Sequence, residues 1–338
     1  MLRYVAQRLG LMVGTLVGVM IITFVLSRIL PGSPVEMMLG AKPTQEQIDA
    51  ARIELGLDRP LYEQFFRYLG DLLNGDFGIS LRTSQPVIDD LFERMTATVE
   101  ITTPAVFLVV LIGVPLGVLS AVRRNSLLDH AARGLSIAGV ALPLFLIAML
   151  LQMLFYGALG WFPLQGRMES NILLDYPFDR VTGFYLIDSL LAGQWPAFFS
   201  ALHHAALPIF SLTLASLAVV TRITRSTMTE ALNEEFVRTV TAYGLPKRSI
   251  YFRYALKATL IPMLTVVGLT YGYMLGGSIV VEYVFDWPGL GGYVVGSILK
   301  SDFPAVMGVT IFLATAYLAI NLIVDLLYFA VDPRLRAQ

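Results

Sequence analysis

The stretch that decides how this chain is organised is residues 221–265, which read TRITRSTMTEALNEEFVRTVTAYGLPKRSIYFRYALKATLIPMLT. Its central part, residues 222–257, is polar and basic and lies between two apolar runs. Seven bases stand there against three acids: Arg222, Arg225, Arg238, Lys247, Arg248, Arg253 and Lys257 against Glu230, Glu234 and Glu235. An ordered helical element with this charge, placed between membrane spans, predicts a docking surface for a cytoplasmic partner.

The composition of the whole chain is that of a polytopic membrane protein. Its 338 residues have a mean hydropathy of +0.69, 56% are apolar and only 14% are charged, whereas soluble domains carry about 25% charged residues. The absence of cysteine excludes disulfides and thiolate chemistry. The first apolar run is longer than a signal-peptide core of roughly 7–15 residues and no A-x-A-like site ends it, so we interpret it as a retained span.

Six runs are long and apolar enough to cross a bilayer, which needs roughly 20 mostly apolar residues. They cover residues 9–30, 98–121, 134–159, 203–221, 259–281 and 305–330. Each should be a helix, because isolated strands cannot satisfy their backbone groups in lipid. The predicted fold is therefore an all-α polytopic membrane protein with six transmembrane helices.

Charge placement predicts that both termini face the cytoplasm. The N-terminus, the connection 122–133, the segment 222–257 and the C-terminus are basic, whereas the alternate connections are acidic. Residues 31–94 hold eleven acids and six bases, for example, and residues 160–200 hold four acids and two bases. Short basic loops stay on the cytoplasmic side. We divide the chain into residues 1–97 (first span and external segment), 98–330 (a five-helix core containing loop 222–257) and the tail 331–338.

The external segment 31–94 has helical periodicity, followed by a turn and short extended chain. Its apolar residues recur every four positions: Ile53, Leu57, Leu61, Phe65 and Leu69. Two interpretations stay open, a cap packed on the outer face or a contact for an external substrate-delivery protein. Glycines also recur every four residues in two spans, at Gly10, Gly14 and Gly18 and at Gly268, Gly272 and Gly276. They predict close helix packing, or the lining of a path or subunit interface.

Within the basic segment, the fourth span is expected to continue as one helix as far as Tyr243. An apolar stripe of Phe236, Val240 and Tyr243, with Val237 beside it, runs along this extension. Gly244 should end the helix because glycine readily adopts the left-handed cap conformation. Pro246 prevents continuation, and a second short helix from residue 247 to residue 257 returns to the membrane.

This helix–turn–helix resembles the cytoplasmic loop of the membrane subunits of binding-protein-dependent ABC importers. That family's pattern is E-A-A, three residues, G, nine residues and I-x-L-P. Anchored on Gly244, the first three positions fall on Arg238, Thr239 and Val240, and the last four fall on residues 254–257, where Leu256 matches. The dipeptide/oligopeptide permease branch uses an R-T-A-R-A-K-G-L version, which Arg238-Thr239 and Gly244-Leu245 fit, while Tyr243 replaces the usual lysine.

Other motifs of the same branch occur in order along nearly the whole chain. They are Gln7-Arg8-Leu9, Pro31-Gly32-Ser33-Pro34, Leu55-Gly56-Leu57-Asp58-Arg59-Pro60, Gly75-Asp76-Phe77-Gly78-Ile79-Ser80, Phe285-Asp286-Trp287-Pro288-Gly289-Leu290-Gly291, Asp302-Phe303-Pro304, Asp325-Leu326-Leu327-Tyr328 and Asp332-Pro333-Arg334. The ordered set is similar to the first of the two permease subunits of a dipeptide importer.

The resemblance implies a type I ABC importer permease fold in a bacterial inner membrane, with a peptide substrate. It also implies a second, homologous permease subunit, two cytoplasmic subunits that bind and hydrolyse ATP with Mg²⁺, and an extracytoplasmic binding protein. This chain has no G-x-x-x-x-G-K-[ST] phosphate loop, so we expect no enzymatic activity and no cofactor in it. The expected ATPase-coupling residues are Arg238, Thr239, Val240, Tyr243, Gly244, Leu245, Pro246, Lys247 and Arg248.

For the translocation path, the fifth span mixes polar side chains with glycines, which indicates Tyr271, Tyr273, Ser278 and Glu282. Glu100, Glu282 and Asp325 are acids within or at the ends of spans, and such residues are functional suspects. Near the span ends, however, they can reach the headgroups, and we expect structural roles. His203 and His204 lack the further ligands of a metal site, so we expect packing or hydrogen bonding there.

Alternative functions remain at this point. The same importer role could serve a nickel chelate, glutathione, an opine or a sugar. A secondary transporter driven by ions should show paired charges near mid-membrane and an inverted repeat, and neither is evident. An intramembrane enzyme should carry a catalytic pair or metal set deep within its spans, and none stands out.

Overall fold

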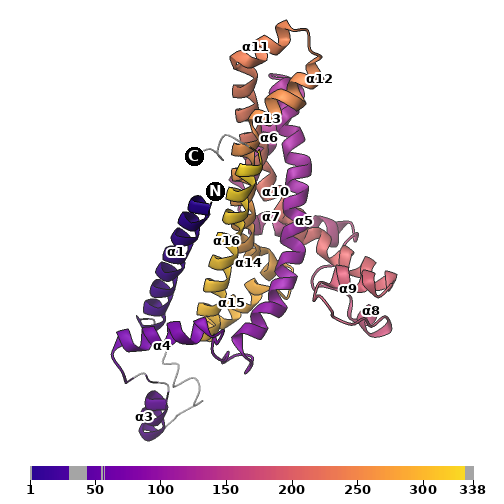
Figure 1. Cartoon of the computed structure of the whole chain (residues 1–338). Coiled ribbons are helices and arrows are strands. Elements are labelled where there is room, and N and C mark those ends of the chain that lie inside the picture. Colours follow the sequence, from indigo (N-terminus) through magenta and orange to yellow (C-terminus); the bar gives the residue numbers. More distant parts are fainter. Residues whose placement is uncertain (1, 30–43, 55, 57, 332–338) are drawn as a thin grey trace. The chain divides into compact units, whose positions relative to one another are not determined.

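The computed structural model describes residues 2–29, 44–54, 56 and 58–331, and these residues are mostly helical (Figure 1). No strand forms in this part of the chain, and its extended pairing is a single isolated bridge between Ile79 and Pro86. The expected all-α class is confirmed. Several residues of the motifs quoted above, 31–34, 55, 57 and 332–334, lie outside the described residues, as does the C-terminal tail from residue 332.

Five helices in the described part of the chain are long and apolar enough to cross a membrane. They are α1 (Leu2–Ile29), α5 (Val87–Val122), α10 (Trp195–Asn233), α14 (Leu260–Val284) and α16 (Phe303–Val331). They coincide with five of the six predicted spans. The shorter elements are α3 (Gln45–Glu54), α4 (Leu61–Leu73), α6 (Leu127–Ala141), α7 (Leu144–Leu151), the π-helix η1 (Gln152–Ala158), α8 (Ser170–Asp175), α9 (Tyr185–Leu191), α11 (Glu235–Ala242), α12 (Lys247–Ser249), the π-helix η2 (Ile250–Ala255), α13 (Leu256–Ala258) and α15 (Leu290–Leu299).

The remaining predicted span, residues 134–159, is divided in the structure. Helix α6 ends at Ala141, and α7 begins after Pro143, whose backbone is extended (φ −60°, ψ 142°). Proline has no N–H to donate to the preceding turn and disfavours the helical conformation of the residue before it. The periodicity of the apolar residues gave no sign of this break. The count of six spans and the cytoplasmic location of both termini stay predictions.

The chain forms two compact units. The first comprises residues 1–96 and 288–318. In it, the helix expected through residues 53–69 is two helices, because Gly56 adopts a positive φ of 66° and Pro60 immediately precedes α4. Phe24 of α1 packs edge-on against Phe65 of α4, with ring centroids 5.4 Å apart.

Two of the quoted motifs of the first unit meet, although about 220 residues separate them in the sequence. The Ser80 hydroxyl donates to the Asp302 carboxylate over 2.6 Å, and both residues are buried. The backbone N–H of Arg82 donates to the same carboxylate oxygen over 3.1 Å. Asp302 thus holds the 80–82 turn against the start of α16. Both interpretations of the external segment, a cap packed on the outer face or a contact for a delivery protein, stay predictions.

The second unit comprises residues 97–287 and 319–338, and helices α5, α7, α10 and α14 supply its apolar core. Leu207, Leu212 and Met274 are among its fully buried side chains. Trp287 is buried in this core, where its indole N–H donates to the Ala97 carbonyl over 2.8 Å. A buried indole needs such a partner.

Helices α5 and α10 approach closely through glycines that the sequence did not single out. A Cβ atom on Gly117 would lie 2.6 Å from Cβ of Thr224 and 2.8 Å from the backbone oxygen of Thr221. Of the glycine stripes that were singled out, Gly268 packs against Val324 in the same way. Gly276 and the three glycines of α1 have no neighbour within 4 Å of that position.

We expect Gly117→Ala to lower the thermal stability of the purified protein. The new methyl group would collide with the backbone of α10, and overpacking of this kind costs about 1–3 kcal/mol. Gly134→Ala on α6 is the matched control, because that position faces open space and alanine favours the helix. A melting temperature lowered equally by both substitutions would contradict the close packing of α5 on α10.

Candidate functional site

The basic segment folds as a helix, a tight turn and a returning helical leg, as expected, but its first helix is interrupted. Helix α10 ends at Asn233, and Glu234 has an extended backbone (φ −68°, ψ 153°) before α11 begins. Asparagine is a poor helix former because its side chain competes for backbone groups, and the Asn233 side chain bonds the Thr229 carbonyl over 2.8 Å. The expectation of one continuous helix to Tyr243 was wrong.

The turn after α11 has the geometry that Gly244 predicts. Its φ is 74°, a left-handed conformation that side chains disfavour. The N–H of Gly244 donates to the Thr241 carbonyl (2.9 Å), and the N–H of Leu245 donates to the Val240 carbonyl (3.4 Å). This pair of bonds is a Schellman motif, and it fixes the direction in which the chain turns.

The returning leg begins at Pro246, whose carbonyl accepts the N–H groups of Ser249 (2.8 Å) and Ile250 (3.2 Å). Helices α12, η2 and α13 then carry the chain to Thr259, and α14 starts at Leu260. The expected short helix over 247–257 is confirmed, with the difference that residues 250–255 are wound as a π-helix. Single π turns within helices are frequent at functional sites.

One side of this helix–turn–helix is anchored by apolar packing. Ala255 of η2 is buried in a cluster with Val118 and Ala121 of α5 and with Met228 and Ala231 of α10. Val237 of α11 and Ile250 of η2 are buried as well. The segment is therefore an ordered part of the second unit, held against the same ends of α5 and α10.

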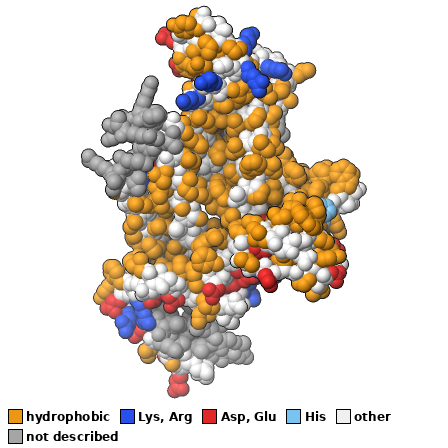
Figure 2. Space-filling model, turned by 45° about the vertical axis from the view of Figure 1, so that its right-hand side comes forward, with side chains coloured by type: hydrophobic (Ala, Val, Ile, Leu, Met, Phe, Trp, Pro, Cys, Tyr) orange, Lys and Arg blue, Asp and Glu red, His pale blue; other side chains and the backbone are white. Residues whose placement is uncertain are grey.

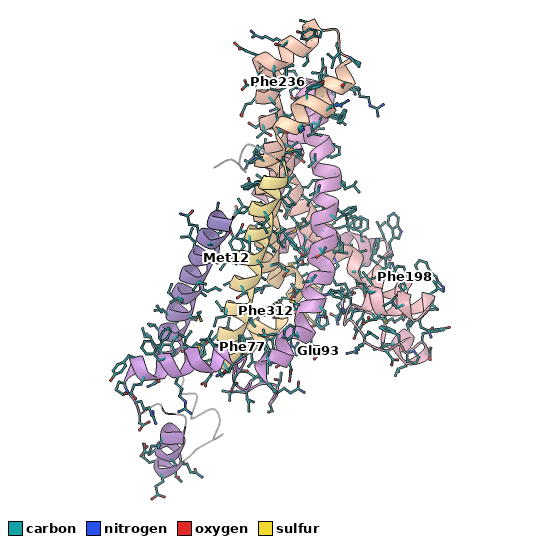
Figure 3. The ribbon with its side chains drawn as sticks, viewed as in Figure 1. Met12, Phe77, Glu93, Phe198, Phe236 and Phe312 are labelled. Atoms are coloured by element: carbon teal, nitrogen blue, oxygen red, sulfur yellow. The ribbon has the colours of Figure 1, made fainter. Side chains whose placement is uncertain are left out.

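The other side is exposed, aromatic and basic. Tyr243 is 82% exposed and Phe236, labelled in Figure 3, is 37% exposed. Of the predicted stripe, Phe236 and Tyr243 are therefore exposed and Val240 is partly buried, whereas Val237 beside the stripe is buried. Figure 2 shows Lys and Arg side chains gathered at this end, where the exposed bases of residues 235–258 are Arg238, Lys247, Arg248, Arg253 and Lys257. Within the described residues, none of these five bases pairs with an acid.

The nine residues expected to couple to a partner lie together around this turn. Val240 and Leu245 are partly buried and the other seven are exposed: Arg238, Thr239, Tyr243, Gly244, Pro246, Lys247 and Arg248. A cationic surface with a protruding tyrosine on a fixed scaffold suits a protein partner with an acidic groove.

The four residues expected along a path do not share one surface. Tyr273 is 68% exposed, and the Tyr271 hydroxyl bonds the Thr103 hydroxyl of α5 over 2.6 Å. Ser278 and Glu282 are buried inside the second unit. The Thr98 hydroxyl donates to the Glu282 carboxylate over 2.7 Å, which joins α5 to α14.

Sequence reasoning missed a buried ion pair at the other end of the second unit. Arg167 Nε donates to Glu100 Oε2 over 2.6 Å, and the other Glu100 oxygen accepts the N–H of Leu186 over 2.8 Å. The Arg167 guanidinium also lies 3.9 Å from the centre of the Tyr185 ring. A single Arg in a long connection carries no pattern that points to this partner, although Glu100 within a span was a signal that one exists.

The two histidines form hydrogen bonds, as expected. A ring nitrogen of His203 lies 2.5 Å from the Trp161 carbonyl oxygen, and one of His204 lies 2.8 Å from the Ser200 carbonyl oxygen. In the part of the chain that the structure describes, no group of three or more metal-binding side chains occurs.

Comparison with known proteins gives consistent matches along the whole chain. Residues 113–337 match the binding-protein-dependent transport system inner membrane component, and residues 1–102 match the N-terminal part of such a membrane component. A probable D,D-dipeptide transport system permease protein of Escherichia coli (strain K12) is 45% identical over 329 residues, covering 97% of this chain and 96% of the relative.

Two further relatives match over nearly their full length. A di/tripeptide transport system permease protein of Pseudomonas aeruginosa (strain UCBPP-PA14) is 40% identical, with 100% of both chains covered. A glutathione transport system permease protein of Escherichia coli O1:K1 / APEC is 33% identical, with 99% of both chains covered.

We expect Arg167→Ala to loosen the connection that carries α8 and α9. Removing one partner of a buried ion pair leaves the other charge uncompensated and costs about 3–5 kcal/mol. Limited proteolysis of the membrane-embedded protein should then cut residues 168–190 roughly tenfold faster or more. Arg180→Ala is the control, since Arg180 is exposed and also stacks on Tyr185 but does not bond Glu100. Equal cleavage rates in both variants would show that the pair does not hold this connection.

Proposed function

This chain belongs to the family of binding-protein-dependent transport system inner membrane components, and we propose on that premise that it is a membrane-spanning permease subunit of an ATP-driven importer of short peptides. The observation that carries this function is the helix–turn–helix at residues 235–258. It is anchored by buried residues on one side and offers an exposed, unpaired cationic surface on the other.

The subunit works in an assembly. We propose that it pairs with a second, homologous permease subunit, that two cytoplasmic ATPase subunits bind below them, and that an extracytoplasmic binding protein delivers the substrate. ATP and Mg²⁺ belong to the ATPase subunits, and this chain contributes no catalytic group. The family's name and the full-length similarity to permease proteins of peptide transport systems support this arrangement.

The coupling surface is formed by Arg238, Thr239, Val240, Tyr243, Gly244, Leu245, Pro246, Lys247 and Arg248. Closure of the ATPase subunits on ATP displaces this surface, and the chain carries the displacement into α10 and α14, to which the segment is joined at its two ends. Alternating access requires two conformations of the permease, one open to each side of the membrane, whose relative populations change when ATP binds. Tyr243 occupies the position at which related loops carry a lysine, so an aromatic contact replaces a charged one there.

The path runs along α14, which is mainly apolar and carries the polar residues Tyr271, Tyr273, Ser278 and Glu282. The Tyr273 side chain lines this path from the exposed face of α14. Ser278 and Glu282 are buried in this conformation, and they reach the path when α14 moves relative to the helices packed on it. The Thr98–Glu282 hydrogen bond is then one of the contacts that the movement breaks.

The substrate class is supported by the relatives with the higher identities, which are named for dipeptides and for di- and tripeptides, while the glutathione relative is more distant. Reconstitution tests the function directly. The four kinds of subunit are placed in proteoliposomes, and uptake of a labelled dipeptide is measured with and without ATP on the ATPase side.

ATP-dependent uptake that competes with unlabelled dipeptides is the expected result. Uptake that follows an imposed proton or sodium gradient and ignores ATP would support a secondary transporter instead. Competition by nickel chelates or sugars, but not by peptides, would show that the substrate is not a peptide. The role of the chain as an importer subunit would be unaffected.

Gly244→Val should abolish uptake while the assembled complex retains its stability. A β-branched residue at a φ of 74° is strained by about 1–3 kcal/mol, so the turn shifts and the coupling surface loses its shape. Gly244→Asn is the matched control, because asparagine tolerates the left-handed region, and it should retain most of the uptake. Normal uptake by a well-expressed Gly244→Val variant would contradict the assignment of the coupling surface.

A further inference from the structure

Asp129 of α6 is a fully buried carboxylate whose two oxygens are bonded from several directions. Oδ1 accepts from the Ser120 hydroxyl (2.5 Å) and from Arg225 Nε (2.6 Å). Oδ2 accepts from Arg225 Nη2 (3.2 Å), from the backbone N–H of Asn125 (3.0 Å) and from Arg133. The charge pattern of the sequence indicated only that this connection is basic, and did not assign Asp129 a role.

These bonds join three helices. Ser120 lies in the last turn of α5, Asp129 in the first turn of α6, and Arg225 in α10, so one carboxylate connects elements up to 105 residues apart in the sequence. Burying a carboxylate is costly unless it is paired and hydrogen-bonded. The guanidinium groups of Arg225 and then Arg133 hold the pKa of Asp129 well below its usual range, so it remains ionised at physiological pH.

The same helices carry the coupling segment. Arg225 lies eight residues before Asn233, where α10 ends and the helix–turn–helix begins. The returning leg packs on Val118 and Ala121 of α5, within one turn of Ser120. Figure 1 shows α11 and α12 beyond these ends of α5 and α10.

Close packing beside the bonds leaves no room for sliding. Gly117, one turn before Ser120, lies against Thr224, which precedes Arg225, so that an added Cβ atom would collide with α10. Gly139 of α6 similarly lies against Ala218 of α10, where an added Cβ would be 2.8 Å from the alanine methyl. Tightly packed contacts transmit displacement rather than absorb it.

We propose that Ser120, Asp129 and Arg225 form a clamp that makes these ends of α5, α6 and α10 move with the coupling segment as one body. Asp129 is a positioning residue, which touches neither substrate nor nucleotide. Through Asp129, a displacement of residues 238–248 reaches α6 directly. Along the chain itself, α6 is connected to the coupling segment only by way of α10. This inference rests on the proposed function.

The test compares two arginines that bind the same carboxylate. Arg225→Ala cuts the link between α6 and α10, whereas Arg133→Ala removes an equal charge from a partner on α6 itself. In proteoliposomes containing the complete importer, ATP hydrolysis and dipeptide uptake are measured together. We expect Arg225→Ala to lower the amount of peptide imported per ATP hydrolysed about fivefold or more, and Arg133→Ala to change it less than about twofold.

A distance measurement separates loss of coupling from loss of folding. The chain contains no cysteine, so within this chain spin labels can be placed uniquely at the exposed positions Leu127→Cys on α6 and Glu230→Cys near the end of α10. With the clamp intact, the distance between the labels should stay the same in the nucleotide-free and ATP-trapped complexes. With Arg225→Ala, it should change between the two states.

Two results would overturn the clamp. The first is a label distance in the unsubstituted clamp that changes on ATP binding; the second is equal coupling in the two arginine variants. Should Arg225→Ala fail to assemble, Ser120→Ala, which cuts the α5 link without altering charge, carries the same expectation for the amount of peptide imported per ATP hydrolysed. Absence of ATP-dependent uptake before any clamp substitution would instead refute the proposed function, so the two failures are distinguishable.

Discussion

Peptide groups in hydrocarbon have no water to bond, so each long apolar run must satisfy its N–H and C=O groups within its own helix. This constraint makes α1, α5, α10, α14 and α16 helical whatever their tertiary contacts. It also leaves little hydrophobic force to hold the helices together, since lipid is as apolar as their side chains. Association then depends on close approach and polar contacts, and Gly117 against Thr224 and the Thr98–Glu282 bond are examples of each.

Helices of this chain end where the sequence supplies a reason. Within hydrocarbon a break also leaves backbone groups unsatisfied, whereas outside the membrane water can bond them. Pro143 removes a donor between α6 and α7, and Asn233 bonds backward to the Thr229 carbonyl at the end of α10. Gly244 offers the positive φ that a Schellman turn needs. The last two breaks shape the coupling segment, because together they set the direction of α11 and of the returning leg.

The coupling segment combines a rigid support with an exposed contact surface. Apolar residues of α5, α10 and η2 fix its inner side, and bases without acidic partners, together with Tyr243, remain on its outer side. A surface on a flexible loop would absorb the motion of a partner. In this chain the loop is short, capped at its turn and packed onto helices that Asp129 joins to a third. The fold thus favours passing a displacement of the coupling segment on to the helices rather than absorbing it in the loop.

By itself, the sequence determined five long helices, the all-α class, the turn at Gly244 and the family, because each depends on residues a few positions apart or on the order of motifs. It did not predict the break at Asn233–Glu234 or the burial of Ser278 and Glu282. Nor did it pair Asp129 with Arg225 or Glu100 with Arg167, which lie 96 and 67 residues apart. Only the tertiary structure decided these features. Local patterns govern hydrogen bonds between residues four apart, whereas the direction and partner of a side chain depend on which distant helix packs against it.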